Sequence, residues 1–288
     1  MRRAVRGLIS RLEIARRWMT WREIRRLRRE SDLVALFLAQ AIEETGARQL
    51  SSEERDWIER IESLRRELEA DRSEISYFDY GAGAALQQRT EQQMAAGAIR
   101  SVQIAEVCRI GSKSPLWCLL LFKLVRSLRP AVCLELGTCL GLSTAYQAAA
   151  LKLNRTGQIV SLEGSDSLAG RAQAHFVRLG FNNARVVRGR FQDTLDQVLA
   201  ADGPFDFAFI DGHHDEKATL GYFEAILGSA APSATLVFDD ISWSPGMARA
   251  WRQIAADRRV QLALNLSQVG ICAIGETARK RSFDLELA

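Results

Sequence analysis

From about residue 129 onward, short apolar runs alternate with segments long enough to hold a helix. Strand-length runs occupy 132–136, 159–162, 185–187, 207–210 and 235–238. Strands buried in a parallel sheet are apolar throughout, and parallel neighbours need a crossover connection that is usually a helix. The alternation therefore predicts repeated βα units that build a parallel sheet.

The C-terminal end departs from this alternation. Two strand-like runs, 260–264 and 269–274, are separated only by 265–268. Four residues are too few for a crossover helix, so the last strand is expected to return antiparallel as a hairpin.

The N-terminal part of the chain has a helical pattern. The first proline is Pro115, and apolar residues recur there at steps of three and four. One helix should open at Ser51 or Ser52, where a hydroxyl can cap it and Glu53 and Glu54 suit its first turn. The aromatic and glycine-rich stretch Tyr77–Gly83 interrupts the pattern and suits a loop that packs over something.

Charge is unevenly distributed. The net charge is +4, yet residues 1–30 hold eleven arginines against Glu13, Glu23 and Glu30, so the rest of the chain is mildly acidic. With Leu8, Leu12, Trp18, Trp21 and Leu27, this basic segment could form a helix at an anionic membrane surface. The interspersed glutamates favour a second interpretation: the charged residues form the solvated face of a helix that packs on its own domain or on a second subunit.

Composition excludes several classes of protein. An apolar content of 47% with 26% charged residues is typical of a globular chain. Apolar runs are too short to span a bilayer, and no apolar segment of a secretory signal follows the first arginines. Five cysteines without a CxxC pair indicate reduced core thiols rather than a metal site, so we expect a cytoplasmic protein.

The turn after the first strand indicates a ligand. Glu135 ends a buried run, Gly137 and Gly141 allow close approach of the backbone, and a helix start at Ser143 supplies amide donors. This arrangement predicts a nucleotide-like ligand. Cys139 stands where a pyrophosphate-binding turn needs its second glycine, and the charge of Glu135 favours a cationic amino group.

Residues 135–144, Glu-Leu-Gly-Thr-Cys-Leu-Gly-Leu-Ser-Thr, resemble motif I of the class I S-adenosylmethionine-dependent methyltransferases. Ser161-Leu-Glu163 and the terminal hairpin extend the resemblance, which covers roughly 115–275. It implies that S-adenosylmethionine is the cofactor, with its ribose on Glu163. The cofactor-binding residues that it implies are Glu135, Gly137, Thr138, Gly141, Ser143, Glu163, Arg190, Phe191 and Asp211. The alternative is that the glycines only make a tight turn and Glu163 is a surface acid.

The predicted fold class is therefore α/β. It comprises a Rossmann-like, seven-stranded, mostly parallel sheet with a terminal antiparallel hairpin, preceded by an N-terminal α-helical extension. We divide the chain into a helical region, 1–114, serving as a lid, oligomerisation element or substrate cap, and a cofactor-binding domain, 115–288. A homo-oligomer is expected.

Three carboxylates follow neighbouring strands. Asp211 ends one apolar run, and Asp239 and Asp240 end the next, so all should meet at the carboxyl edge of the sheet. Clustered carboxylates need a cation or a shared proton, and oxygen ligands suit Mg²⁺. The cluster resembles that of metal-dependent O-methyltransferases, including those acting on sugars, although Asp240 stands where the catechol type has Asn. Alternatively, the acidic pair caps the next helix.

Two of the three histidines, His213 and His214, follow Asp211 directly. Histidine titrates near neutrality and can remove the proton of an acceptor hydroxyl. In some sugar methyltransferases the base lies three residues after the first metal acid, which implies His214. His213 and Asp211 are further catalytic candidates. Alternatively, one histidine packs against Tyr222 or Phe223 and the other is solvated.

Together these features predict an O-methyltransferase for a small-molecule, sugar or peptide acceptor, with a role in secondary metabolism among the options. The patterns at 210–224 and 238–251 resemble a little-characterised bacterial branch and are silent on substrate. Two other classes compete: an inactive methyltransferase-like binding module, and a nicotinamide oxidoreductase, which Cys139 and the hairpin disfavour. No nucleic-acid partner is expected, because the body is acidic and lacks an Asn-Pro-Pro-Tyr type motif.

Overall fold

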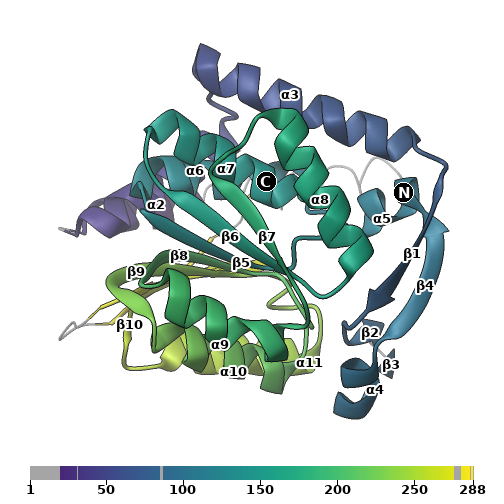
Figure 1. The fold of residues 1–288 in the computed structure, drawn as a ribbon. Coiled ribbons are helices and arrows are strands. Elements are labelled where there is room, and N and C mark those ends of the chain that lie inside the picture. The colour runs from purple at the N-terminus through teal and green to yellow at the C-terminus, as the bar shows by residue number, and fades with distance from the viewer. Residues whose placement is uncertain (1–19, 31, 85–86, 276–279, 286, 288) are drawn as a thin grey trace, which may run out of the picture.

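The computed structural model describes residues 20–30, 32–84, 87–275, 280–285 and 287. Its centre is an eight-stranded sheet with the order β12-β10-β11-β9-β8-β5-β6-β7 (Figure 1). The strands are β5 (Val132–Leu136), β6 (Gln158–Glu163), β7 (Ala184–Arg188), β8 (Phe205–Ile210), β9 (Ala230–Phe238), β10 (Val260–Leu266), β11 (Val269–Ile274) and β12 (Arg281–Asp284). The strands β5 to β9 pair in parallel, as the alternating pattern predicts.

The terminal hairpin is confirmed. β11 runs antiparallel to β10 on one side and to β9 on the other. The number of strands differs from the prediction, because β12 pairs in parallel with β10 and adds an eighth. Its sequence, Arg-Ser-Phe-Asp, has one apolar residue, Phe283, which is buried. So short and polar a strand carries no apolar signal.

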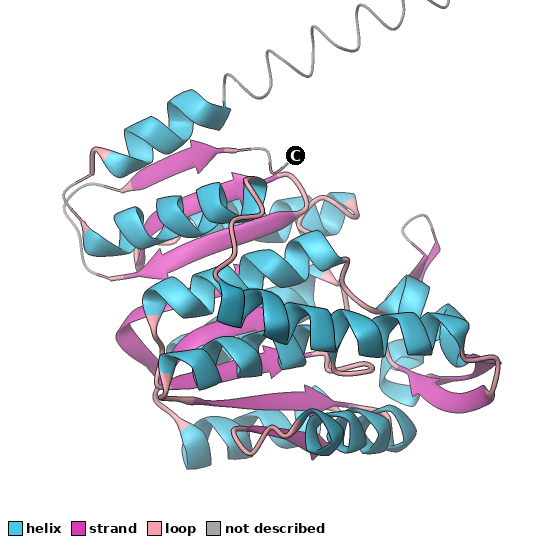
Figure 2. Ribbon diagram, turned by 90° about the horizontal axis from the view of Figure 1, so that it is seen from above, coloured by secondary structure: helices cyan, strands magenta, loops and turns pink. Residues whose placement is uncertain are grey.

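Helices cover both faces of the sheet (Figures 1 and 2). One face carries α6 (Pro115–Leu128), α7 (Leu142–Asn154) and α8 (Asp166–Leu179), and the other carries α9 (Phe191–Asp202), α10 (Glu216–Leu227) and α11 (Pro245–Ala256). Alternate residues of one strand serve the two faces: Cys133 packs in the core under α7, whereas Leu134 and Leu136 pack in the core over α9 and α10. Glu135 shares the α7 face with Cys133.

The N-terminal region is only partly helical. The helices α2 (Leu33–Gly46), α3 (Ser52–Ala70) and α5 (Ile104–Gly111) fit the prediction, and Ser51 caps α3 in a capping box with Glu54. Between them lies a β-ribbon, shown at the side of the molecule in Figure 1. It comprises β1 (Glu74–Asp79) paired antiparallel with β4 (Ala98–Gln103), and the short elements β2 (Gly83–Ala84), β3 (Gln87–Gln88) and α4 (Glu91–Ala96).

The prediction of a helical region over 1–114, interrupted only at Tyr77–Gly83, is therefore wrong for the ribbon, and Tyr77–Asp79 belongs to a strand rather than to a loop. Pairing of two segments far apart in sequence stabilises β1, and no local signal reports such a partner.

A buried ion-pair network joins the N-terminal helices to the sheet domain. Lys123 of α6 is 2% exposed, and its Nζ lies 2.8 Å from both Glu44 Oε2 and Glu54 Oε2. Arg126 Nε lies 3.2 Å from Glu54 Oε1. Burial alone would raise the pKa of Glu54, but the bonds from Lys123 and the Ser51 amide outweigh it and hold that pKa below its usual value. The helices share a core with α6 and α7, and the division at residue 114 stays a prediction.

The end of the basic segment packs on the protein itself. A helix covers 20–28, and Ile24 and Leu27 are buried in the main core. Arg28 pairs with Glu43, and Glu30 pairs with Arg281 at 3.2 Å. This supports the packed alternative for residues 20–30. Residues 1–19 lie outside the described part, so membrane contact stays untested.

All five cysteines are free, and four of them are buried; Cys139, in the turn after β5, is intermediate. Along the described part of the chain, no helix has both the length and the apolar character to cross a bilayer.

Candidate active site

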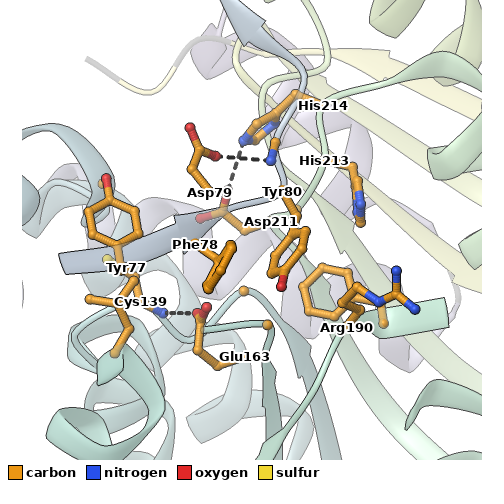
Figure 3. Close-up of a pocket in the computed structure, with 17 residues that line it drawn as sticks. Tyr77, Phe78, Asp79, Tyr80, Cys139, Glu163, Arg190, Asp211, His213 and His214 are labelled. Carbon is orange, nitrogen blue, oxygen red and sulfur yellow. Dashed lines mark hydrogen bonds and ion pairs between the residues drawn. The ribbon is translucent and has the colours of Figure 1, made fainter. Parts of the chain in front are cut away.

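A cleft opens where the carboxyl ends of the strands meet the β1 segment (Figure 3). Its walls come from the turn after β5, the end of β6, the start of α9, the turn after β8 and the ribbon. The lining residues are Tyr77, Phe78, Asp79, Tyr80, Gly81, Gly111, Gly137, Cys139, Glu163, Gly164, Leu168, Arg190, Phe191, Asp211, Gly212, His213 and His214. Segments far apart in sequence thus form one site.

The glycines of the β5–α7 turn are required by close contacts. Gly137 has a φ of 101°, and a Cβ there would lie 2.0 Å from the carbonyl oxygen of Asp211. Gly141 has a φ of 82°, and its Cβ would lie 2.7 Å from the Phe176 ring. Gly137 lines the cleft, whereas Gly141 lies outside its lining. Gly141 therefore fits the alternative in which the glycine only makes a tight turn. Gly137 makes a close packing contact and also lines the cleft.

Glu135 lies beneath the cleft rather than on its wall. Its carboxylate accepts hydrogen bonds from Thr144 Oγ1, from Ser161 Oγ at 2.7 Å and from Gln147 Nε2 at 3.0 Å. Burial raises its pKa to about 7 against these bonds. Glu135 thus ties β5, β6 and α7 together. Thr138, bonded to Ser161 at 2.6 Å, and Ser143 are buried outside the lining as well.

Glu163 ends β6 and lines the cleft. Its Oε2 accepts the backbone N–H of Cys139 at 2.8 Å, and its Oε1 accepts that of Ser165 at 2.9 Å (Figure 3 shows the first). Burial raises the pKa of Glu163. The two amides fix the carboxylate toward the β5–α7 turn, and each oxygen keeps a lone pair for a ligand hydroxyl.

Arg190 and Phe191 form the wall at the start of α9. Arg190 Nε lies 2.6 Å from Asp193 Oδ2, and its NH1 donates to the Ala95 carbonyl at 3.0 Å, so the guanidinium is held from two sides. The Phe191 ring packs on Gly212, where a Cβ would lie 2.4 Å from the ring. Arg190 and Phe191 both line the cleft.

His214 stands between two carboxylates at the cleft. Its Nε2 lies 3.6 Å from Asp211 Oδ1, its Nδ1 lies 3.8 Å from Asp240 Oδ2, and its side chain is 26% exposed. The ring of Trp243 lies 5.7 Å away. His213, His214 and Asp240 all have left-handed φ values, 62°, 52° and 52°. Such strain in non-glycine residues is concentrated at functional sites.

His213 has a different environment. Its Nδ1 lies 2.7 Å from the Tyr222 hydroxyl, its Nε2 lies 3.3 Å from Gln192 Nε2, and the ring packs edge-on against Phe191. Burial lowers its pKa to about 4, so it is neutral near pH 7. His213 is therefore the histidine that packs against Tyr222, as the alternative prediction had it.

Burial and the charges of Asp211 and Asp240 raise the pKa of Asp239, so the three acids lie together, but only Asp211 lines the cleft. Asp239 is buried outside the cleft lining, and its Oδ2 contacts the Nζ of Lys113, from the loop between α5 and α6. Its Oδ1 has no partner among the described residues. Nor does the described part of the chain contain three or more His, Cys, Asp or Glu side chains grouped to hold a metal ion. With Lys113 in contact with Asp239, the donor set therefore does not fit a metal.

Sequence reasoning missed Lys113, and it did not identify the cleft as the place that the aromatic stretch covers. Lys113 has no motif around it, and only the fold brings it to Asp239. Tyr77–Gly83 was expected to pack over something, and the structure places it over the cleft. Its Phe78 and Tyr80 rings stack 6.0 Å apart, and Tyr80 packs against Gly164, where a Cβ would lie 2.8 Å from the ring.

Comparisons with known proteins agree with this geometry. Residues 134–241 match the model of a family described as a methyltransferase domain. A catechol O-methyltransferase of Niastella koreensis is 36% identical over 110 residues, covering 38% of this chain and 48% of that protein. "Probable O-methyltransferase Rv1703c" of Mycobacterium tuberculosis is 36% identical over 127 residues, covering 41% and 52%. The chain spans about half the length of these curated relatives.

A solved structure is similar too. The O-methyltransferase from Bacillus cereus in complex with SAH is 27% identical, with a TM-score of 0.50, over 59% of this chain and 89% of that one. The fold of this chain is thus similar to that of the methyltransferase from Bacillus cereus. Residues 134–241 match a methyltransferase domain and are similar to S-adenosylmethionine-dependent O-methyltransferases, which confirms the resemblance seen in the sequence.

Proposed function

We propose that this protein transfers a methyl group from S-adenosylmethionine to a hydroxyl of an acceptor, which is a small molecule, a sugar or a peptide. The observation that carries the proposal is the position of His214, on the cleft wall between Asp211 and Asp240. The O-methyltransferase relatives support the same reaction.

The cleft residues suit this cofactor. Glu163 would hold the ribose hydroxyls, Arg190 and Phe191 would face the adenine, and Gly137 and Asp211 would face the methionine end. When bound, the cofactor supplies an electrophilic methyl group on its sulfonium. Tyr80 and its neighbours cover the cleft and exclude water.

His214 is the proposed base. It takes the proton of the acceptor hydroxyl, and the oxygen forms a bond to the methyl carbon as the carbon–sulfur bond breaks and its electron pair stays on sulfur. Asp211 and Asp240 flank the ring and stabilise the imidazolium that forms. The neutral His213 is a positioning residue, because both its ring nitrogens face polar partners. Alignment of oxygen, carbon and sulfur supplies much of the rate.

The proposed mechanism does not use Mg²⁺, because Lys113 contacts Asp239, a carboxylate that the metal would need as a ligand. The inactive binding module remains the competing class. Glu163, Asp211 and His214 together on the cleft support an enzyme instead. A homo-oligomer and a cytoplasmic location stay predictions.

The test is methyl transfer itself. Purified protein incubated with fractionated extract and methyl-labelled cofactor should yield a product that carries the label on oxygen, identified by mass spectrometry, with SAH formed in equal amount. His214→Ala protein in the same extract controls for other enzymes. Label on nitrogen or carbon would refute O-methylation, and SAH binding without labelled product would favour the binding module.

A further inference from the structure

We propose that the ammonium of Lys113 takes the place of a divalent cation in the carboxylate cluster, so that this methyltransferase works without a metal. The inference rests on the proposed function, since it concerns how the same site handles charge. It starts from a difference between the sequence pattern, which resembles metal-dependent enzymes, and the contacts in the fold.

Lys113 reaches the cluster from outside the sheet. It lies between the end of α5 at Gly111 and the start of α6 at Pro115. Its side chain is 15% exposed, and the Asp239 side chain that it contacts is 1% exposed. A buried carboxylate needs a cation or several hydrogen-bond donors. The Lys113 ammonium donates a hydrogen bond to Asp239 Oδ2.

The loop that carries Lys113 is held in place. The Cys118 thiol donates to the Lys113 carbonyl at 3.5 Å, and Pro115 sets the first turn of α6. On the other side, Gly111 packs against the β5–α7 turn: a Cβ on Gly111 would lie 3.2 Å from Cys139 Sγ. The ammonium is thus a fixed part of the site rather than a surface group that swings away.

Lys113 acts on the whole cluster: it contacts Asp239, and the charges of Asp211 and Asp239 raise its pKa against the effect of burial. Asp211 and Asp240 also face the two nitrogens of His214. Mg²⁺ requires nearly octahedral oxygen ligands at about 2.1 Å and keeps several waters. An ammonium on Asp239 removes one ligand and repels a second cation at close range. An ammonium also offers no open coordination position to an acceptor hydroxyl, so removal of its proton falls to His214.

The test is binding of Mn²⁺, measured by electron paramagnetic resonance on the full chain with and without SAH. Four proteins are compared: wild type, Lys113→Met, Lys113→Met with Asp211→Asn, and Lys217→Met. Methionine is unbranched and only one atom shorter than lysine, and it carries no charge. Lys217 is an exposed lysine paired with Glu91, so its variant controls for the loss of one positive charge.

We expect no saturable Mn²⁺ site in wild type or Lys217→Met. Lys113→Met should bind one Mn²⁺ at least about tenfold more tightly than any residual binding in wild type, because a like charge has been removed at close range. Asp211→Asn should abolish that site. If wild type binds one Mn²⁺ as tightly as Lys113→Met does, or if Lys113→Met gains no binding, the inference is wrong. Thermal melting checks folding, and Lys113→Gln replaces a variant that fails it. Loss of SAH binding would count against the proposed function instead, because Mn²⁺ binding is read without turnover.

Discussion

His214→Ala should lower kcat by about 10²- to 10⁴-fold, the usual contribution of a general base. The imidazole lies between Asp211 and Asp240 on the cleft wall, and alanine leaves no group there to take the acceptor proton. SAH affinity should change little, since His214 is proposed to act on the acceptor rather than on the cofactor. Steady-state kinetics with the acceptor found by labelling, and calorimetry with SAH, measure the two effects.

The adjacent histidine gives a matched control. His213→Gln removes a ring that contacts Tyr222 and Phe191, so the melting temperature should fall. The folded fraction should keep a rate far above that of His214→Ala. Added imidazole should restore part of the activity of His214→Ala alone. A His214→Ala enzyme with a nearly normal kcat, or a larger loss in His213→Gln, would assign the base elsewhere.

Gly137→Ala should be the most destabilising single-methyl change at the site. A Cβ would lie 2.0 Å from the Asp211 carbonyl oxygen, and the φ of 101° is strained for any side chain. Backbone strain and overpacking cost about 1–3 kcal/mol each, so the free energy of unfolding should fall by about 2–5 kcal/mol. Urea denaturation measures this change.

Gly221→Ala is the control. Gly221 lies within α10, and a Cβ there meets nothing within 4 Å. Alanine should raise stability by up to about 1 kcal/mol, because it is the better helix former. Equal effects of the two substitutions would show that the close approach of Gly137 to the β8 strand end is not maintained in solution.

The local signals of the chain predict a large part of the fold. Apolar runs locate the strands, the short connection 265–268 predicts the hairpin, and Ser51 predicts the start of α3. These features depend on neighbours in sequence, which is why a single chain reveals them. β12 and the β1–β4 ribbon depend on distant partners instead.

The same distinction applies to the site. Asp211, Glu163 and His214 end or follow apolar strands, so a parallel sheet brings them to one edge, as predicted. The pleat decides which residues near a strand end face the ligand, and Glu135 points under α7 instead. Lys113 comes from a loop without a motif, so its contact with Asp239 emerges only from tertiary packing.

Binding of SAH, measured by calorimetry, tests the central claim that this cleft holds the methyl-donor cofactor. Wild type should bind SAH at one site per chain. Glu163→Gln should bind it at least about tenfold more weakly, because hydrogen bonds to a charged carboxylate contribute more than 1.4 kcal/mol. Glu59→Gln, at an exposed glutamate paired with Arg66, should bind like wild type. Absence of SAH binding, or equal affinity in Glu163→Gln and wild type, would contradict the account.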